Sequence, residues 1–270
     1  MSNWKLSEDE CTKYLNDNFG NETIKFEGVG KSNSTLSDIK VLKNGNLLFY
    51  IEAKMDIAQS GQFVLLKENN EFVYSNRNTT PLDTFSEIIL NYINENFNYY
   101  KDVDTSCLDI NLPQYIFNSW IIKHYELKNV KYLITDLGYD KVIFPINKFG
   151  EYFSITSGFR TKTSGSSDLP NSHVDIVKKY LAENLLINST FSIQKEDKHY
   201  FLYLSTPITI SDPFKFVINS TRYMLRFDSP NKYIIKKLSN TKNPNVIFSI
   251  KFNGKCNTHD LIAFKNDLLI

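Results

Sequence analysis

The strongest constraint on the fold is a strand that begins apolar on both faces and ends in two charged residues. Residues 47–54 read LLFYIEAK, and both alternating sets of side chains begin with hydrophobic residues. Successive side chains of a strand point to opposite faces, so both faces are expected to be covered by other parts of the chain. Glu52 and Lys54 then project from one face near the end of the strand. The sequence therefore predicts a carboxylate and an ammonium group side by side in a buried sheet.

A second carboxylate is expected beside them, because the preceding strand pairs with this one. Asp38 opens a short apolar strand over residues 38–42, and residues 43–46 read KNGN, which carries an Asn-Gly hairpin signal. An antiparallel hairpin of these strands brings Asp38 opposite the Glu52 end. Removing two acids and a lysine from water is unfavourable, and a divalent cation would offset the repulsion between the acids. The hairpin therefore predicts a metal site at one edge of the sheet.

Length and composition are those of an ordinary globular protein. The chain has 270 residues, of which 41% are hydrophobic and 23% charged, enough for two domains or one large one. Cys11, Cys107 and Cys256 are far apart and odd in number, so neither a disulfide framework nor a zinc site is expected. The acidic amino-terminal residues do not resemble a signal peptide, and no run of about 18 apolar residues is present to span a membrane. We therefore expect a cytoplasmic protein.

The charge distribution says more about a partner than the net charge of +1 does. The first sixty residues hold nine acids and seven bases, whereas residues 220–255 hold eight Lys and Arg with Asp228 as their only acid. An acidic metal-binding end and a basic far end suit a protein that holds a phosphate backbone. A solvated basic face without function explains the composition equally well.

Hydrophobic spacing elsewhere predicts a chain that contains both helices and sheets. Helices are expected at residues 4–19 (or from the capping box of Ser7 and Glu10 onward), 81–97, 113–126, 174–186 and 260–268. Paired strands are expected at 63–66 with 72–74 and at 132–135 with 141–145, and further strands at 191–193, 199–204, 221–227, 233–237 and 246–252. Residues 55–62 are expected to form a short loop or a helical turn.

The catalytic-looking residues resemble a known nuclease pattern. An Asp, a hairpin and then Glu-x-Lys is the pattern of the PD-(D/E)xK nuclease superfamily, and Asp38, Glu52 and Lys54 match it. A longer string resembles the HhaI family of type II restriction endonucleases, and its parts are Asn3-Trp4-Lys5, Ser37-Asp38, Tyr50 to Met55, Gln59 and Gly61 to Leu65. Patches as far as Asn245 to Ile250 extend the resemblance over nearly the whole chain. The departures are a hairpin two residues longer and a divergent stretch from about residue 188 to residue 229.

This resemblance implies a fold and a reaction. The fold is α/β of the α+β type, in which a PD-(D/E)xK nuclease core with a mixed β-sheet is flanked by helices and joined to strand-rich α+β regions. The implied activity is that of a type II site-specific deoxyribonuclease, which uses Mg²⁺ and water to cleave double-stranded DNA at a palindrome such as GCGC. Asp38, Glu52 and the Ala53 carbonyl are expected to hold Mg²⁺. Lys54 is expected to hold the attacking water and stabilise the developing charge.

The resemblance also assigns roles to residues that the sequence alone would leave unremarked. Glu8 matches a glutamate that related nucleases place beside the metal, and its alternative role is to favour the amino terminus of the first helix. Gln62 is assigned a catalytic role and Gln59 a DNA contact, in which they orient the attacking water or the scissile phosphate. Without the resemblance, both would be unremarkable surface glutamines.

Several polar and basic segments are expected to contact DNA. Residues 156–167 are expected to form a recognition hairpin that presents Arg and Lys to guanine in the major groove; a solvated hairpin is the alternative. The glycine between two serines at its tip allows backbone amides to approach bases or phosphates. The expected DNA-binding residues are Ser34, Ser37, Gln59, Arg160, Lys162, Ser164, Gly165, Ser166, Lys236 and Lys237.

These assignments divide the chain into three expected regions: a catalytic nuclease domain at 1–129, a sequence-recognition region at 130–187, and a basic, backbone-binding region at 188–270. The expected partner is double-stranded DNA, with no membrane and with a companion DNA methyltransferase in the cell. A monomer that nicks the strands in turn is expected, and a transient dimer is the alternative. Two other functions stay open, a structure- or damage-directed nuclease of the same superfamily and a catalytically inactive DNA-binding module.

Overall fold

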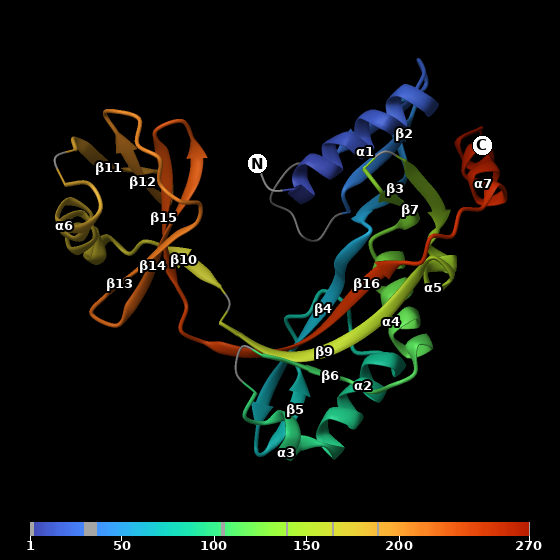
Figure 1. The fold of residues 1–270 in the computed structure, drawn as a ribbon, viewed down its shortest axis with the longest axis horizontal. Coiled ribbons are helices and arrows are strands. Elements are labelled where there is room, and N and C mark those ends of the chain that lie inside the picture. Colours follow the sequence, from blue (N-terminus) through green and yellow to red (C-terminus); the bar gives the residue numbers. More distant parts are fainter. Residues whose placement is uncertain are drawn as a thin grey trace. The chain divides into compact units, whose positions relative to one another are not determined.

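The computed structural model describes residues 3–29, 37–103, 106–138, 140–163, 165–187 and 189–269. The chain forms two compact units, which are treated separately below. Unit 1 comprises Met1–Thr161 and Pro244–Ile270, and unit 2 comprises Lys162–Asn243. Strands β9 (Phe153–Thr163) and β16 (Lys242–Phe252) carry the chain from one unit to the other and back (Figure 1). Helices and sheets occur in both units, which confirms the expected α+β fold.

The first sheet of unit 1 contains the charged strand. Its order is β1 (Ile24–Gly28), β2 (Ile39–Lys43), β3 (Asn46–Met55), β7 (Val130–Asp136) and β8 (Lys141–Pro145). β2 and β3 form the predicted antiparallel hairpin, which Asn44 and Gly45 turn with positive φ angles. β7 runs parallel to β3, whereas β8 runs antiparallel to β7. The sheet is therefore mixed, as the sequence predicts.

Helices cover both faces of this sheet, as the apolar character of β3 requires. Helix α1 (Asn3–Phe19) and helix α7 (Thr258–Leu269) pack with Phe49, Ile51 and Ala53 of β3. The opposite face carries Tyr50 and belongs to a larger aromatic core, which includes helix α4 (Gln114–Glu126). None of the described helices is both long and apolar enough to cross a membrane.

The second sheet of unit 1 corrects one prediction. Its order is β5 (Glu71–Tyr74), β4 (Ile57–Glu68), β16, β9 and β6 (Cys107–Asp109). Residues 57–62 form the beginning of β4, where a short loop or helical turn was expected. Their partner is β16, nearly two hundred residues later, with Gln62 opposite Ile247 and a bulge before Ser249. Gly61 has a φ of +91°, and a Cβ atom there would lie 2.8 Å from Trp120, so this irregular strand requires glycine.

Short helices complete unit 1, and a polar network holds α7 in place. The helices are α2 (Thr84–Glu95), α3 (Phe97–Tyr100), the 3₁₀ turn η1 (Ile146–Lys148) and α5 (Phe149–Tyr152).

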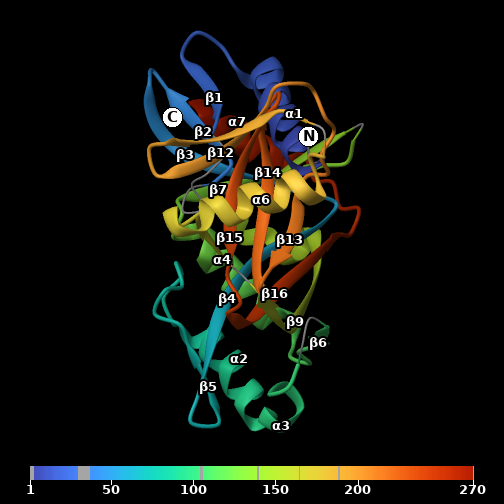
Figure 2. The ribbon, with the colours of Figure 1, turned by 90° about the vertical axis from the view of Figure 1, so that its left-hand side faces the viewer.

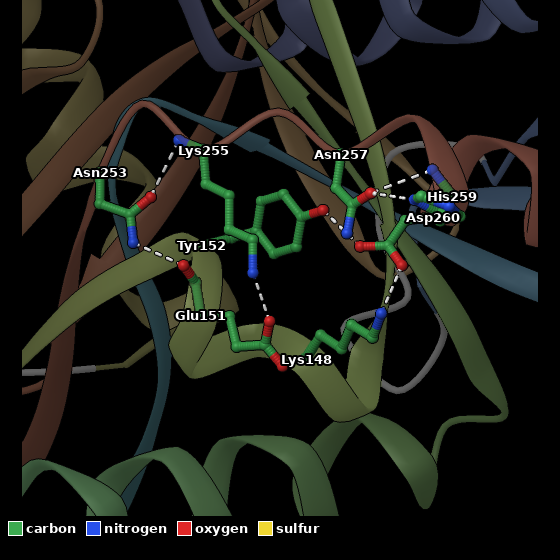
Figure 3. A network of polar contacts seen from close by, with 8 residues as sticks. All are labelled: Lys148, Glu151, Tyr152, Asn253, Lys255, Asn257, His259 and Asp260. Carbon is green, nitrogen blue, oxygen red and sulfur yellow. Dashed lines mark hydrogen bonds and ion pairs between the residues drawn. The ribbon is translucent and has the colours of Figure 1, made fainter.

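Asp260 of α7 is 2% exposed, accepts a hydrogen bond from Lys148 Nζ at 2.6 Å and another from the Tyr152 hydroxyl (Figure 3). Lys255 pairs with Glu151 in the same network. These contacts fasten the segment before α7 to residues 148–152.

Unit 2 has its own sheet and its own core. The strand order is β11 (Phe191–Glu196), β12 (His199–Leu204), β15 (Lys232–Leu238), β14 (Thr221–Ser229) and β13 (Phe214–Ile218), and β10 (Ser166–Asp168) also pairs with β15. The 3₁₀ turn η2 (Asn171–His173) leads into helix α6 (Val174–Asn184), which lies across one face of the sheet (Figure 2). Val177 and Leu181 of α6 are fully buried, and Tyr180 stacks on Phe216 of β13 with 4.9 Å between ring centroids.

The two compact units do not follow the three regions expected from the sequence. β7 and β8 lie after residue 130 but complete the first sheet of unit 1, and β16 and α7 return to unit 1 from the expected third region. The reason is non-local pairing, because the partner of β3 is a strand more than seventy residues further along the chain.

Candidate active site

The β2–β3 hairpin assembles the three predicted catalytic side chains. Asp38 lies directly before β2, and its Oδ2 accepts a hydrogen bond from the Ala53 backbone N–H at 3.0 Å. Glu52 and Lys54 lie two residues apart on β3, with 2.6 Å between Lys54 Nζ and Glu52 Oε1. The carboxylates and the lysine therefore converge at the end of β3, as the hairpin predicts.

The three groups lie in a poorly hydrated environment under helix α4. Glu52 is only 6% exposed, and the side chain of Lys54 is only 15% exposed. Tyr125 of α4 is buried, shares a hydrogen bond with the Ser60 hydroxyl at 3.0 Å, and has Lys54 Nζ 5.8 Å from its ring centroid. An aromatic face attracts a cation, so Tyr125 helps to hold Lys54 in place.

Burial and neighbouring charges set the protonation of the two carboxylates. Burial and, after it, the charge of Glu52 raise the pKa of Asp38 to about 7, because Lys54 offsets them only in part. Burial also disfavours the charged form of Glu52, but the Lys54 ammonium outweighs this effect and lowers the pKa of Glu52 below its usual value. Burial opposes the charge of Lys54, yet Glu52 holds its pKa well above the usual range. Two carboxylates thus compete for one lysine.

This imbalance fits a bound divalent cation. Mg²⁺ binds proteins through one or two carboxylates and retains several water ligands. Asp38 and Glu52 supply carboxylate oxygens beside the Ala53 backbone, and a cation there would relieve the repulsion that helps to raise the pKa of Asp38. Within the described ranges, no group of three His, Cys, Asp or Glu side chains is arranged to hold a metal, so the site offers two carboxylates.

Polar groups that the sequence interpretation overlooked surround the site. Thr135 of β7 lies opposite Lys54 in the parallel pairing, and its hydroxyl is fully buried with no hydrogen-bond partner in the described part of the chain. Tyr125 and Ser60 bridge α4 and β4 beside Lys54. Tyr125 lies in the helix expected at 113–126, and its place beside Lys54 depends on how β3 pairs with β7, which the sequence does not reveal.

The other residues predicted to act in catalysis lie at different distances from the Asp38 and Glu52 carboxylates. Glu8 lies on α1 near the carboxylates, because its charge raises the pKa of Asp38. Ser37 is buried beside Glu52 and lowers the pKa of that carboxyl. Gln62 and Gln59 lie on β4, where Gln59 Nε2 donates to Gln62 Oε1 at 3.3 Å. In the described contacts, these glutamines bond to neighbours other than the catalytic carboxylates.

Over the described residues 156–163 and 165–167, two strands of different sheets take the place of the expected recognition hairpin. β9 pairs with β6 and β16, whereas β10 pairs with β15, so the two halves of the segment belong to different sheets. Arg160 of β9 donates from Nη2 to Gln59 Oε1 at 3.2 Å within unit 1, while Lys162 begins unit 2. Phe159 of β9 is buried and Arg160 beside it is half-buried, but the sequence could not identify the partner strands.

The remaining predicted DNA-binding residues lie in unit 2 or outside the described residues. Ser34 and Ser164 lie outside the described ranges. Gly165 accepts a hydrogen bond from Ser239 N at 3.0 Å, and Ser166 pairs with Leu238. Lys236 forms an ion pair with Asp168, 2.5 Å from Nζ to Oδ1, whereas Lys237 forms none with any described residue.

Comparison with known proteins agrees with this site. No protein-family model matches the chain, and a search of curated proteins found no match. Among solved structures, the fold matches that of HhaI endonuclease in complex with DNA, with a TM-score of 0.84 and 32% sequence identity over 100% of both chains. The mixed sheet with acidic and basic residues at its edge therefore defines a restriction-endonuclease fold. The chain belongs to the HhaI endonuclease family.

Proposed function

We propose that this type II restriction endonuclease cleaves double-stranded DNA at a short palindrome such as GCGC in a Mg²⁺-dependent reaction. The observation that carries the proposal is the convergence of Asp38, Glu52 and Lys54 at the sheet edge, in a chain that matches HhaI endonuclease over its whole length. That relative was solved as a complex with DNA, which supports DNA as the substrate here.

The proposed reaction is the hydrolysis of a phosphodiester bond. Asp38, Glu52 and the Ala53 carbonyl would hold Mg²⁺, which when bound polarises the phosphate and makes a water molecule more acidic. Lys54 lies against Glu52 and is positioned to orient the attacking water and to stabilise the charge that develops on phosphate oxygens. Water adds to phosphorus and the bond to the 3′ oxygen breaks, so the products carry 5′-phosphate and 3′-hydroxyl ends. Glu8 and Gln62 would support this constellation.

Sequence recognition is proposed for Arg160 and for polar residues that follow it in the chain. Arg160 would read guanine from β9, where Gln59 holds its guanidinium. Lys162, Gly165 and Ser166 would contribute from the segment that follows. Lys237 would contact the DNA backbone, and a contact from Lys236 would require its ion pair with Asp168 to open.

The proposed setting is a cytoplasmic monomer that nicks the two strands in turn. One Asp38, Glu52 and Lys54 set cuts one strand, so a monomer has to nick the two strands in turn; a transient dimer is the alternative. A companion DNA methyltransferase is expected in the cell, because a restriction endonuclease requires protection of the host's own sites.

Digestion of unmethylated phage DNA tests the proposed function. The DNA is incubated with Mg²⁺, with and without EDTA, and the ends of the fragments are sequenced. Discrete Mg²⁺-dependent fragments that end within one palindrome are expected, and they name the recognition site. A smear, or cleavage restricted to branched or damaged DNA, would instead identify a nuclease that selects DNA by structure. Retained DNA binding without cleavage would identify a binding module.

A further inference from the structure

A second lysine approaches the active site from the connection between α4 and β7. Lys128 lies two residues after α4, and its backbone N–H donates to the Tyr125 carbonyl at 3.0 Å. Its Nζ lies 5.8 Å from the centroid of the Tyr125 ring, and Lys54 Nζ lies 5.8 Å from the same centroid. Two ammonium groups thus converge on one buried aromatic ring beside the catalytic carboxylates.

The shared ring is a firmly held platform. Tyr125 is 2% exposed, and its hydroxyl shares a hydrogen bond with the fully buried Ser60 of β4. A cation over an aromatic face is attracted by the ring, but its charge is not neutralised there. Tyr125 therefore restricts the position of both lysines and leaves their charge available to a further anion.

The two lysines differ in what already balances their charge. Lys54 forms its ion pair with Glu52 at 2.6 Å. Lys128 is half-buried and forms no ion pair with any residue in the part of the chain that the structure describes. Burial lowers the pKa of Lys128; Glu52 opposes this effect and Lys54 adds to it, so these charges lie within electrostatic reach of each other. An anion entering the site would improve the environment of Lys128.

We propose that Lys128 binds a phosphate of the DNA backbone at the active site and supplies the positive charge that Lys54 shares with Glu52. The ligand class is a phosphodiester, which has the negative charge and acceptor oxygens that a compact ammonium binds. This inference rests on the proposed cleavage of DNA. It adds a substrate-binding residue that lies outside the Asp38, Glu52 and Lys54 pattern.

The test compares Lys128→Met, Lys128→Arg and Lys123→Met with the wild-type enzyme. Lys123 is an exposed lysine in the last turn of α4, five residues before Lys128, and serves as the matched control. Steady-state cleavage of a duplex that carries the mapped recognition site is measured at several NaCl concentrations. We expect Lys128→Met to lower kcat/KM about 10- to 100-fold, mainly through KM, because a charged hydrogen bond to phosphate is lost. A plot of log(kcat/KM) against log[NaCl] should become less steep by about 1, the change expected for the loss of one phosphate contact.

The variants separate a charge effect from a structural one. Lys128→Arg should keep most of the activity and the wild-type salt slope, and Lys123→Met should behave as the wild type. Equal losses in Lys128→Met and Lys128→Arg, or an unchanged salt slope, would overturn phosphate binding by Lys128. A fully active Lys128→Met enzyme would overturn it as well, while wild-type cleavage leaves the proposed function standing. Absence of wild-type cleavage would overturn the proposed function itself.

Discussion

Each unit of the molecule contains a compact cluster of acidic and basic side chains, and the two clusters are balanced differently. In unit 1, Asp38 and Glu52 share Lys54 in a buried setting, which raises the pKa of Asp38. In unit 2, the single carboxylate of Asp168 lies 2.5 Å from Lys236 and 2.6 Å from His199. Asp168 is 33% exposed at its side chain, and the hydrogen bond from Lys236 lowers its pKa. An excess of buried acid calls for a cation from outside, whereas a self-balanced cluster needs none.

The largest expected difference between the clusters is in catalysis. Glu52→Gln keeps the size of the side chain but removes a charge that would hold Mg²⁺, so we expect a loss in kcat of about a thousandfold or more. Asp168→Asn makes the same chemical change in unit 2 and should leave kcat nearly unchanged. Single-turnover cleavage of the mapped duplex measures both. Cleavage by Glu52→Gln at the wild-type rate would refute the catalytic assignment.

Removal of the lysine should lower the free energy of unfolding much more in the unit 1 cluster than in the unit 2 cluster. Lys54→Met leaves two buried carboxylates without their cation, and breaking a buried pair costs about 3–5 kcal/mol. Mg²⁺ should restore part of this loss, because it binds the folded site. Urea unfolding with and without Mg²⁺ checks both statements. If Mg²⁺ leaves the stability of the wild type and of Lys54→Met unchanged, the site is not a metal site.

The pH dependence of stability should reflect a buried histidine of unit 1, His124. His124 is 9% exposed, stacks on Trp120 and shares a hydrogen bond with the Thr80 hydroxyl. Burial, and then the charge of Lys128, lowers its pKa from 6.5 to about 4. His124 therefore binds a proton between these values in the unfolded chain but not in the folded chain, so its contribution to stability falls by about 3 kcal/mol as the pH falls from 6.5 to 4. Asp38, whose pKa is raised, contributes in the opposite direction.

Urea unfolding of the wild type and of His124→Gln at several pH values checks this expectation. The difference in stability between the wild type and His124→Gln should therefore change across that window, while the steepness of the unfolding transition stays the same. His199→Gln in unit 2 is the matched control. An identical pH dependence in the wild type and His124→Gln would contradict a neutral, buried His124.

The smallest effect is expected for the lysine of the unit 2 cluster. Lys236→Met breaks a partly exposed ion pair, and such pairs contribute about 0–1 kcal/mol to folding. Mg²⁺ should not change the result, because Asp168 is a single, already balanced carboxylate. The urea midpoint of the variant, measured beside that of Lys54→Met, decides whether the clusters differ as described. A loss as large as that of Lys54→Met would erase the distinction.

The same contrast explains what the sequence could and could not predict. The Asp38, Glu52 and Lys54 cluster is local, because an Asn-Gly turn and two alternating strands define it within a short stretch. Its surroundings are not local. The beginning of β4 follows no simple alternation, because Gly61 and a bulge interrupt its pairing with β16. The segment around Arg160 looks like a hairpin in sequence, yet its halves pair with strands of different sheets.

Lys128 and Thr135 were missed for a related reason. Neither belongs to a motif, and each reaches the site only because β7 lies parallel to β3. Parallel pairing across a helical connection leaves no turn signal that would fix the register in the sequence. The catalytic motif can therefore be predicted from the sequence, whereas the residues around it can be identified only from the structure.

The position of β16 in the second sheet determines when this sheet can be completed during synthesis. β16 lies between β4 and β9 in that sheet, although β4 precedes unit 2 in the chain and β9 ends at its beginning (Figure 1). A ribosome therefore delivers β4 and β9 with their inner edges unpaired, and only the later arrival of β16 closes the sheet. A nascent chain interrupted within unit 2 holds the Asp38, Glu52 and Lys54 hairpin and all five strands of its sheet, but it lacks β16 and the α7 helix that packs on that sheet. An enzyme aimed at DNA thus becomes complete only late in its own translation.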